Sequence, residues 1–176
     1  MAKADEKYLG PWISIQDPVN RMEASFPYQP IEMTFDLPLQ NTPPIGHLHV
    51  FSSSTKSAVF ILSALSLPTI NEDILQGEAF KKNFEHYLVP RLFYSPHFFY
   101  QNQSFSFEKT SFKNQPALLF GFSYLDHQTP RLLKGLAVVK GHTLYSIFSL
   151  ASEAHFTEED LQQFIESFRL LSDQKL

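Results

Sequence analysis

The stretch RLLKGLAVVKGHTLYSIFSLASEAHFTEEDLQQFIESFRLL, residues 131–171, decides the fold. Two apolar runs, residues 132–139 and 144–151, flank Lys140-Gly141, where the glycine supplies the positive φ that a short hairpin loop needs. Apolar residues then recur every three or four positions, which is the period of a helix with one buried face. They are Leu161, Phe164, Ile165, Phe168 and Leu171. The stretch predicts a strand, a tight turn, a second strand and a helix that packs on the sheet.

Thr157 has the features of a helix N-cap. Its hydroxyl is expected to accept from the amide of Asp160, whose carboxylate reaches back as in a capping box. Phe156 and Leu161 flank this cap and are expected to pack on each other as a hydrophobic staple. The last helix is therefore predicted to begin at Thr157.

The rest of the chain predicts further strands and one more helix. Alternating or continuous apolar runs indicate strands at residues 12–15, 31–37, 47–51, 58–67, 103–109 and 117–125. Residues 58–67 lack alternation, so this strand is expected to be covered on both faces. A helix is predicted from the cap Asn71 to the break at Pro90. Two amphipathic helices and such a sheet favour an α+β fold, a three-layer α/β/α sandwich with a mostly antiparallel sheet.

Length and composition indicate one globular domain. The chain has 176 residues, 43% of them hydrophobic and 18% charged. We expect an N-terminal extension over residues 1–21, a single domain over 22–172 and a tail over 173–176. The net charge of −4, with scattered Lys and Arg, argues against nucleic acid as a partner. The absence of cysteine excludes disulfides and thiolate chemistry.

Four short motifs resemble the Mog1/PsbP/DcrB-like superfamily. They are SFPYQP at residues 25–30, TPPIG at 42–46 with an aromatic at Phe51, LSLP at 65–68 and FIESFRL at 164–170. The resemblance spans residues 22 to 171 and departs from the family at Gln29, where a lysine is common. It implies an antiparallel sheet between helices and an accessory, chaperone or binding role without catalysis. Under this resemblance Phe26, Phe168 and Leu170 pack in the core, and Gly46 sets a turn.

The segment RLFYSPHFFY, residues 91–100, is the first candidate binding site. Pro96 excludes a regular helix, so its rings are not expected to share one buried face. Aromatic residues and Arg are enriched at binding hot spots. The predicted partner-binding residues are Phe93, Tyr94, Phe98, Phe99 and Tyr100. The alternative is that these rings are core residues beneath the first helix.

His47-Leu48-His49 is the second candidate site. Histidines two apart on a strand project from the same face and could hold a divalent metal, given a third ligand from Asp126, His127, His142 or His155. The alternative is a solvated strand face, which the missing diagnostic spacing favours. A hydrolase using a serine with Asp126 and His127 is a third hypothesis, weakened because no Gly-x-Ser-x-Gly motif is present.

These patterns together predict a non-enzymatic accessory or chaperone-like protein-binding domain of bacterial type. The alternatives are a metal- or small-ligand-binding domain centred on His47 and His49, and a hydrolase. We expect no cofactor and no metal, and a partner that is another protein, a hydrophobic client segment or a second copy of the chain. No apolar run approaches the roughly 20 residues of a membrane span. As written, the chain predicts a cytoplasmic protein, or an extracytoplasmic one if a leader has been removed.

Overall fold

A seven-stranded antiparallel sheet is the main element of the computed structural model, which describes residues 11–38, 44–93 and 104–172. Its strand order is β3-β4-β5-β9-β8-β7-β6. The strands are β3 (Ile31–Pro38), β4 (Pro44–Ser54), β5 (Ala58–Ser66), β6 (Ser104–Phe112), β7 (Gln115–Asp126), β8 (Thr129–Lys140) and β9 (Thr143–Ser152). A smaller antiparallel sheet has the order β1-β2-β10, with β1 (Ile13–Asp17), β2 (Met22–Phe26) and β10 (Arg169–Leu170). The predicted mixed fold with mostly antiparallel strands is confirmed.

The predicted hairpin near the end of the chain is also confirmed. Strands β8 and β9 pair over most of their length, and Lys140 lies opposite Thr143 at the tip. Gly141 has a φ of +61°, the left-handed region that glycine occupies without steric cost. Strand β5 lies beside β9 in the interior of the sheet, and its central residues are buried as predicted.

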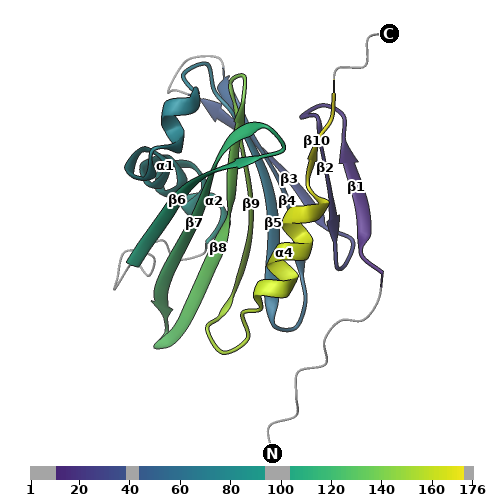
Figure 1. Ribbon diagram of the computed structural model, residues 1–176, viewed down its shortest axis with the longest axis vertical. Helices are drawn as coiled ribbons and strands as arrows, with labels where there is room; N and C mark the ends of the chain where they lie inside the picture. Colours follow the sequence, from purple (N-terminus) through teal and green to yellow (C-terminus); the bar gives the residue numbers. More distant parts are fainter. Residues whose placement is uncertain (1–10, 39–43, 94–103, 173–176) are drawn as a thin grey trace, which may run out of the picture.

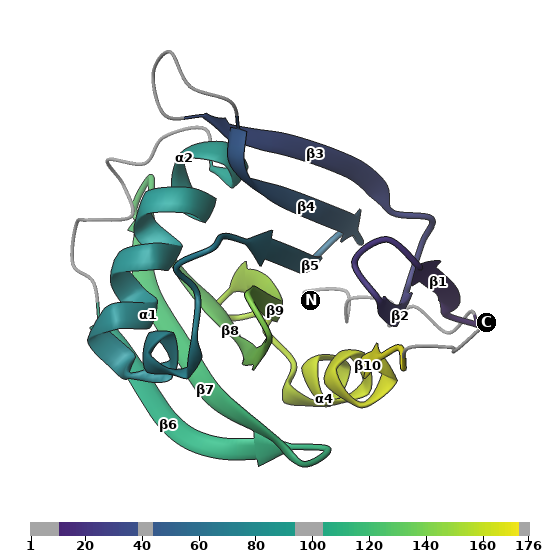
Figure 2. The same ribbon diagram turned by 90° about the horizontal axis from the view of Figure 1, so that it is seen from above.

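One face of the large sheet is covered by a helical segment inserted between β5 and β6. It consists of a 3₁₀ turn (Glu72–Leu75), α1 (Gly77–Asn83), a π-helical turn (Phe84–Leu88) and α2 (Val89–Leu92). As predicted, Asn71 caps the segment, because its side chain accepts from the amide of Asp73 at 2.8 Å. Figure 2 shows the curved sheet wrapping around α1 and α2.

The predicted helix break at Pro90 is wrong. Pro90 lies in the first turn of α2, and the amide of Val89 donates to the carbonyl of Phe84 across the wider π turn. Proline cannot donate a helical hydrogen bond and its ring collides with the carbonyl four residues earlier. The π turn immediately before Pro90 lets the chain stay helical through the proline.

The other face is covered by α4 (Glu158–Ser167) and by the three-stranded sheet. Figure 1 shows α4 in front of the middle strands, and Figure 2 shows it on the side of these strands away from α1 and α2. Residues Arg169 and Leu170 pair with Glu23 and Met22, so the last part of the described chain joins the N-terminal hairpin.

The structure corrects two details of the predicted last helix. The helix ends at Ser167, and Phe168 is its C-cap with ψ of 132°, so the residues after it form β10 instead of a further turn. Thr157 is the N-cap residue, but its hydroxyl donates to the Asp160 carboxylate at 2.7 Å and makes no bond to a helix amide. The expected capping box is therefore incomplete.

The large sheet separates two hydrophobic cores. Leu48 and Val50 of β4 belong to the core beneath α1, whereas Phe51 belongs to the core beneath α4. Phe26, Phe164 and Phe168 are fully buried in the second core, and Phe84 and Phe148 are fully buried in the first. Leu170, expected in the core from the family resemblance, is half-buried and packs at the edge of the second core.

The sequence predicted only part of the N-terminal hairpin. The strand expected at residues 12–15 extends from Ile13 to Asp17, so part of the predicted extension over residues 1–21 belongs to the small sheet. Strand β2 was not predicted, although Met22, Ala24 and Phe26 alternate as buried residues. The prolines at positions 18, 27 and 30 obscured this short strand, yet all three lie outside it.

Candidate functional site

The predicted aromatic site lies mostly outside the described residues. Phe93 follows the end of α2, is half-buried and packs against the core beneath α1. Tyr94, Phe98, Phe99 and Tyr100 fall in residues 94–103, which the structure does not describe. Phe93 thus belongs partly to the core, and the other four remain predicted binding residues.

Segment 94–103 leads directly into β6, which is an edge of the large sheet in the described part of the chain. Most β6 side chains are exposed, and Phe107 retains 49% of its accessible surface. The Phe107 ring covers Gly77 of α1: a Cβ at Gly77 would lie 2.4 Å from Phe107 Cδ1. Figure 1 shows β6 as the outermost strand on the side of α1.

The hairpin that joins β6 to β7 determines which amides of β6 face away from the sheet. Its two-residue loop, Lys113-Asn114, has φ values of 45° and 66°. In such a hairpin the pair that flanks the loop, here Phe112 and Gln115, is hydrogen-bonded, and bonded pairs alternate with non-bonded pairs from there. The residues whose amides consequently face away from β7 are Phe105, Phe107, Lys109 and Ser111.

His47 and His49 project from the same face of β4 but contact different acids. His47 Nδ1 lies 2.8 Å from Asp36 Oδ1 on β3, and both side chains are exposed. His49 is buried, with 8% of its surface exposed, and each ring nitrogen faces a carboxylate. Its Nδ1 lies 2.7 Å from Asp17 Oδ2, and its Nε2 lies 2.6 Å from Glu32 Oε1.

The contacts of His49 favour a structural role. Asp17 accepts from the amides of Val19 and Asn20 and from the Asn20 side chain, so it organises the turn between β1 and β2. The Tyr145 hydroxyl, from β9, donates to the Asn20 carbonyl at 2.7 Å. His49 and Tyr145 therefore hold this turn against the large sheet.

Within the described residues, no three His, Cys, Asp or Glu side chains are arranged to hold a metal ion. Both ring nitrogens of His49 already contact carboxylates, and those of Asp17 and Glu32 lie on opposite sides of the ring. A tetrahedral or octahedral metal needs at least three convergent ligands. The described geometry thus offers no support for the metal hypothesis at His47 and His49.

The hydrolase candidates Asp126 and His127 lie at the turn between β7 and β8. His127 Nε2 lies 3.8 Å from Asp126 Oδ1, while Arg131 Nε lies 2.9 Å from Asp126 Oδ2. A different pair, Ser152 and His155, is in contact, with Oγ and Nδ1 2.6 Å apart. Ser152 is the last residue of β9, and His155 lies in the turn that follows, so their contact is typical of a local turn contact.

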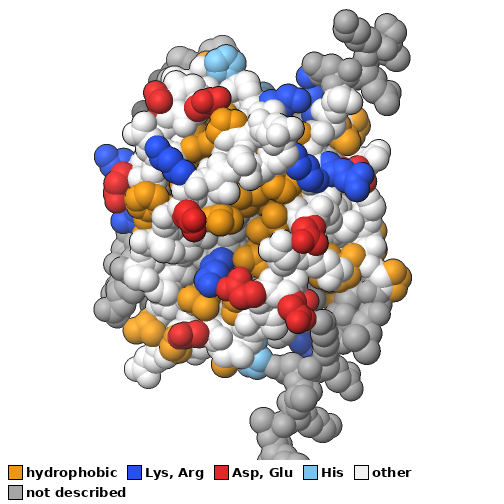
Figure 3. All heavy atoms as spheres, in the orientation of Figure 1, with side chains coloured by type: hydrophobic (Ala, Val, Ile, Leu, Met, Phe, Trp, Pro, Cys, Tyr) orange, Lys and Arg blue, Asp and Glu red, His pale blue; other side chains and the backbone are white. Residues whose placement is uncertain are grey.

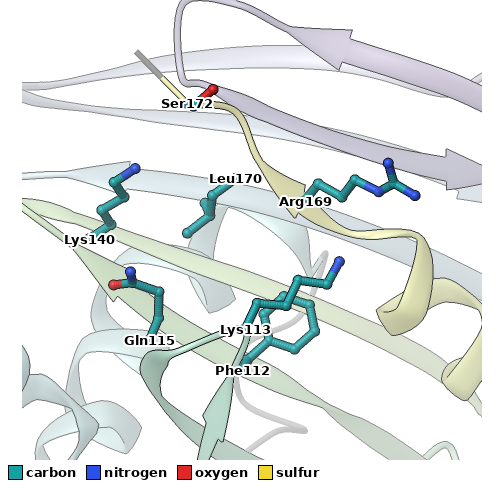
Figure 4. Close-up of a pocket in the computed structure, with 7 residues that line it drawn as sticks. All are labelled: Phe112, Lys113, Gln115, Lys140, Arg169, Leu170 and Ser172. Carbon is teal, nitrogen blue, oxygen red and sulfur yellow. The ribbon is translucent and has the colours of Figure 1, made fainter.

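Sequence reasoning missed a pocket of about 550 Å³ at one end of the large sheet. The tips of the β6–β7 and β8–β9 hairpins meet β10 there. Its lining residues are Phe112, Lys113, Gln115, Lys140, Arg169, Leu170 and Ser172. In Figure 4, Lys140 and Gln115 lie on one side, Phe112 and Lys113 on the other, and Leu170 between them. The available signal was a lysine at each of two hairpin tips, but the sequence does not show that these tips are neighbours.

The fold and these surfaces define a mixed α/β protein with mostly antiparallel sheets. In the described part of the chain, none of the helices has the length and apolar character that crossing a bilayer demands.

Comparisons with known proteins identify no family. No model of a known protein family matches the chain, and no curated protein matches it. Among solved structures the chain is similar to PA94 of Pseudomonas aeruginosa, a protein of unknown function. The TM-score is 0.44 at 9% identity, and the match covers 83% of this chain and 86% of PA94. A likeness at this level carries no argument about function.

Proposed function

We propose that this protein is a non-enzymatic, chaperone-like accessory domain that binds another protein along strand β6 and the aromatic segment before it. The observation that carries the proposal is the exposed edge strand itself. Strand β6 is nine residues long, and in the described structure β7 is its neighbour on one side. An open edge presents unpaired amides and carbonyls to which an extended segment of a partner can add as a further strand.

The side chains of β6 suit such a partner. Phe105 and Phe107 lie on the face toward α1, with ring centroids 5.5 Å apart, and Phe107 is half exposed. The predicted binding residues Tyr94, Phe98, Phe99 and Tyr100 precede this strand by a few positions. Main-chain pairing would supply affinity, and the rings would supply specificity for an apolar client segment.

Glu108 and Lys109 favour a different role for β6, in which its charges protect the exposed edge from pairing with other chains. Charged residues on edge strands commonly protect a protein from edge-to-edge aggregation. Neither charge blocks an added strand, because the pairing uses the main chain. The experiment therefore has to separate the role of the Lys109 amide from that of its charge.

The variants Lys109→Pro and Lys109→Gln distinguish the role of the Lys109 amide from the role of its charge. Both remove the charge, but only proline removes the outward amide. The partner is first captured from native bacterial lysate, identified and purified. We expect this purified partner to bind the wild type and Lys109→Gln with equal affinity, and to bind Lys109→Pro at least tenfold more weakly. Hydrogen exchange should show the outward amides of β6 protected by the partner. Equal binding of all three proteins, without such protection, would contradict the proposal.

The double change Phe98→Ser and Phe99→Ser tests the aromatic part. We expect it to abolish capture or self-association while leaving the melting temperature nearly unchanged. A large fall in melting temperature would show that these rings belong to the core.

We also propose that the fold is the three-layer α/β/α sandwich of the Mog1/PsbP/DcrB-like superfamily. The positions of α1 and α2 on one face and α4 on the other support this assignment. The three-stranded sheet beside α4 is an addition to that plan.

A further inference from the structure

The pocket at the end of the large sheet concentrates positive charge on an acidic protein. Lys113, Lys140 and Arg169 line it, although the chain as a whole has a net charge of −4. In Figure 3 several Lys and Arg side chains gather in the upper right of the view, where β10 lies in Figure 1. This local excess of cations is therefore not a general property of the surface.

Across the described residues, no ion pair joins these three cations to a carboxylate. The strand register places Glu23 of β2 opposite Arg169, but Glu23 does not line the pocket. Its Oε1 accepts from Ser14 Oγ at 2.9 Å. The positive charge of the pocket is consequently left for a ligand to balance.

Lys113 is held in place and yet keeps donors for a ligand. Its Nζ donates to the Phe168 carbonyl at 2.8 Å and lies 4.9 Å from the centre of the Phe112 ring. An ammonium group has three donors, so the bond to the Phe168 carbonyl leaves donors for an anion. Burial, and then the neighbouring Arg169, lower the pKa of Lys113 below its ordinary value. An anion between the two cations would remove this repulsion.

The shape of the pocket restricts the ligand. A volume of about 550 Å³ is in the range of small-molecule sites. The side chains of Phe112 and Leu170 give the lining an apolar part between the polar ends (Figure 4). The guanidinium fork of Arg169 matches two phosphate oxygens, and lysines act as point charges for a dianion.

We propose that this pocket binds a phosphate monoester, with the phosphate group between Lys113 and Arg169 and the organic part against Phe112 and Leu170. The pocket includes Phe112, the last residue of β6, but none of the residues whose outward amides are proposed to pair with a partner protein. The same phosphate chemistry occurs in a free monoester and in the headgroup of phosphatidic acid.

Titration of the full chain with phenyl phosphate, followed by calorimetry, tests the proposal. We expect phenyl phosphate to bind at least tenfold more tightly than inorganic phosphate, which lacks the apolar part, and than benzoate, which has one charge. Lys113→Gln and Arg169→Gln should each weaken the binding of phenyl phosphate at least tenfold, because each removes a charged partner of the phosphate group. Both side chains are exposed, so the melting temperature should stay within a few degrees of the wild type.

Lys56→Gln is the matched control. Lys56 is an exposed lysine two residues before the start of β5, at the end of the sheet where Ala58 pairs with Ala151. The pocket lies at the opposite end, where Lys140 pairs with Thr143. Lys56→Gln removes the same charge and should leave the affinity for phenyl phosphate unchanged. An equal loss in Lys56→Gln would mean that only the net charge matters, which would overturn the proposal.

Vesicles distinguish the two sources of the phosphate. Vesicles of phosphatidylcholine with about one tenth phosphatidic acid, compared with phosphatidylcholine alone, test the headgroup as the ligand. Binding that needs phosphatidic acid and is lost in Lys113→Gln but not in Lys56→Gln would assign a membrane source. Binding of phenyl phosphate without vesicle binding would assign a free monoester. If neither phenyl phosphate nor the vesicles with phosphatidic acid bind at millimolar concentrations of phosphate groups, the proposed site is wrong.

Discussion

One face of the large sheet is covered by a single continuous segment, residues 72–92, and the other face by two segments from opposite ends of the described chain. On the first face, Phe84 packs within 5.7 Å of the Phe120, Phe122 and Phe148 ring centres. On the second face, Phe26, Phe60 and Phe164 form a similar cluster of rings. Both faces therefore bury aromatic surface, which is the main source of their stability.

The second face differs from the first in the hydrogen bonds that join its two covering segments to each other and to the large sheet. The Ser25 amide donates to Ser167 Oγ at 2.9 Å, and the Leu171 amide donates to the Arg21 carbonyl at 2.8 Å. His49 and Tyr145 contact the turn at Asp17 and Asn20 from the large sheet. Two segments without a short covalent connection need such directional bonds to fix their register. The comparison teaches that rings supply the burial and that polar contacts position the chain ends.

Truncation of a buried ring should have the largest effect on either face. Phe168→Ala and Phe84→Ala should each lower the free energy of unfolding by about 3 to 5 kcal/mol, because each leaves a cavity where a ring is fully buried. Urea unfolding measures both. If Phe168→Ala cost less than about 1 kcal/mol, the second face would not be part of the cooperative core.

His49→Ala should have the next largest effect. It leaves the buried Asp17 carboxylate without the imidazole, which we expect to cost about 2 to 3 kcal/mol. His47→Ala is the control, since exposed ion pairs contribute only about 0 to 1 kcal/mol. Equal losses in the two variants, again from urea unfolding, would mean that the contact with the N-terminal turn contributes nothing special.

Tyr145→Phe should cost about 1 kcal/mol at neutral pH, because it removes the hydrogen bond to the Asn20 carbonyl. Burial raises the pKa of the Tyr145 hydroxyl above its ordinary value, against a lowering by Arg21 and with a further rise from Asp17. The unfolded chain therefore loses this proton first, near pH 10, and the native state loses stability as the pH rises further.

The advantage of the wild type over Tyr145→Phe should thus shrink above about pH 10. Thermal melts between pH 8 and 11 measure this difference. Burial also raises the pKa of Tyr124, so some alkaline loss should persist in the variant. A wild-type advantage that grows with pH would contradict the assigned direction.

Thr157→Ala should have the smallest effect. The Thr157 hydroxyl bonds to the Asp160 carboxylate instead of a helix amide, so we expect about 0.5 kcal/mol, the low end for a lost N-cap. Chemical denaturation with replicate curves resolves this change. A loss above about 2 kcal/mol would show that the hydroxyl has another role.

Local patterns in the sequence predicted the large sheet well. The continuous apolar run at 58–67 correctly indicated that β5 is buried on both faces. The alternation in residues 31–37 predicted the buried face of β3 only in part, because Leu37 is buried whereas Ile31 on the same face is 70% exposed. Gly141 marked its turn because few other residues adopt a positive φ there. Such features depend on neighbouring residues alone.

Contacts between distant parts of the chain could not be predicted in this way. Asp17 and Glu32 meet His49 only once three strands are in register. The same holds for Lys113, Lys140 and Arg169, which reach one pocket from three separate turns or strands. The pairing of β2 with β10 likewise has no local signal, since β10 has only two residues.

The pairing of β2 with β10 also sets an order for folding during synthesis. Strand β2 can pair with β1 as soon as both have left the ribosome, but its other edge stays open until residues 169 and 170 follow. Bringing β2 and β10 together closes a long loop, which costs more conformational entropy than forming the hairpins between these two strands. This step is therefore expected to be slower. Until β10 has been synthesised, the hairpin of β1 and β2 therefore has an exposed strand edge, which favours aggregation of the nascent chain.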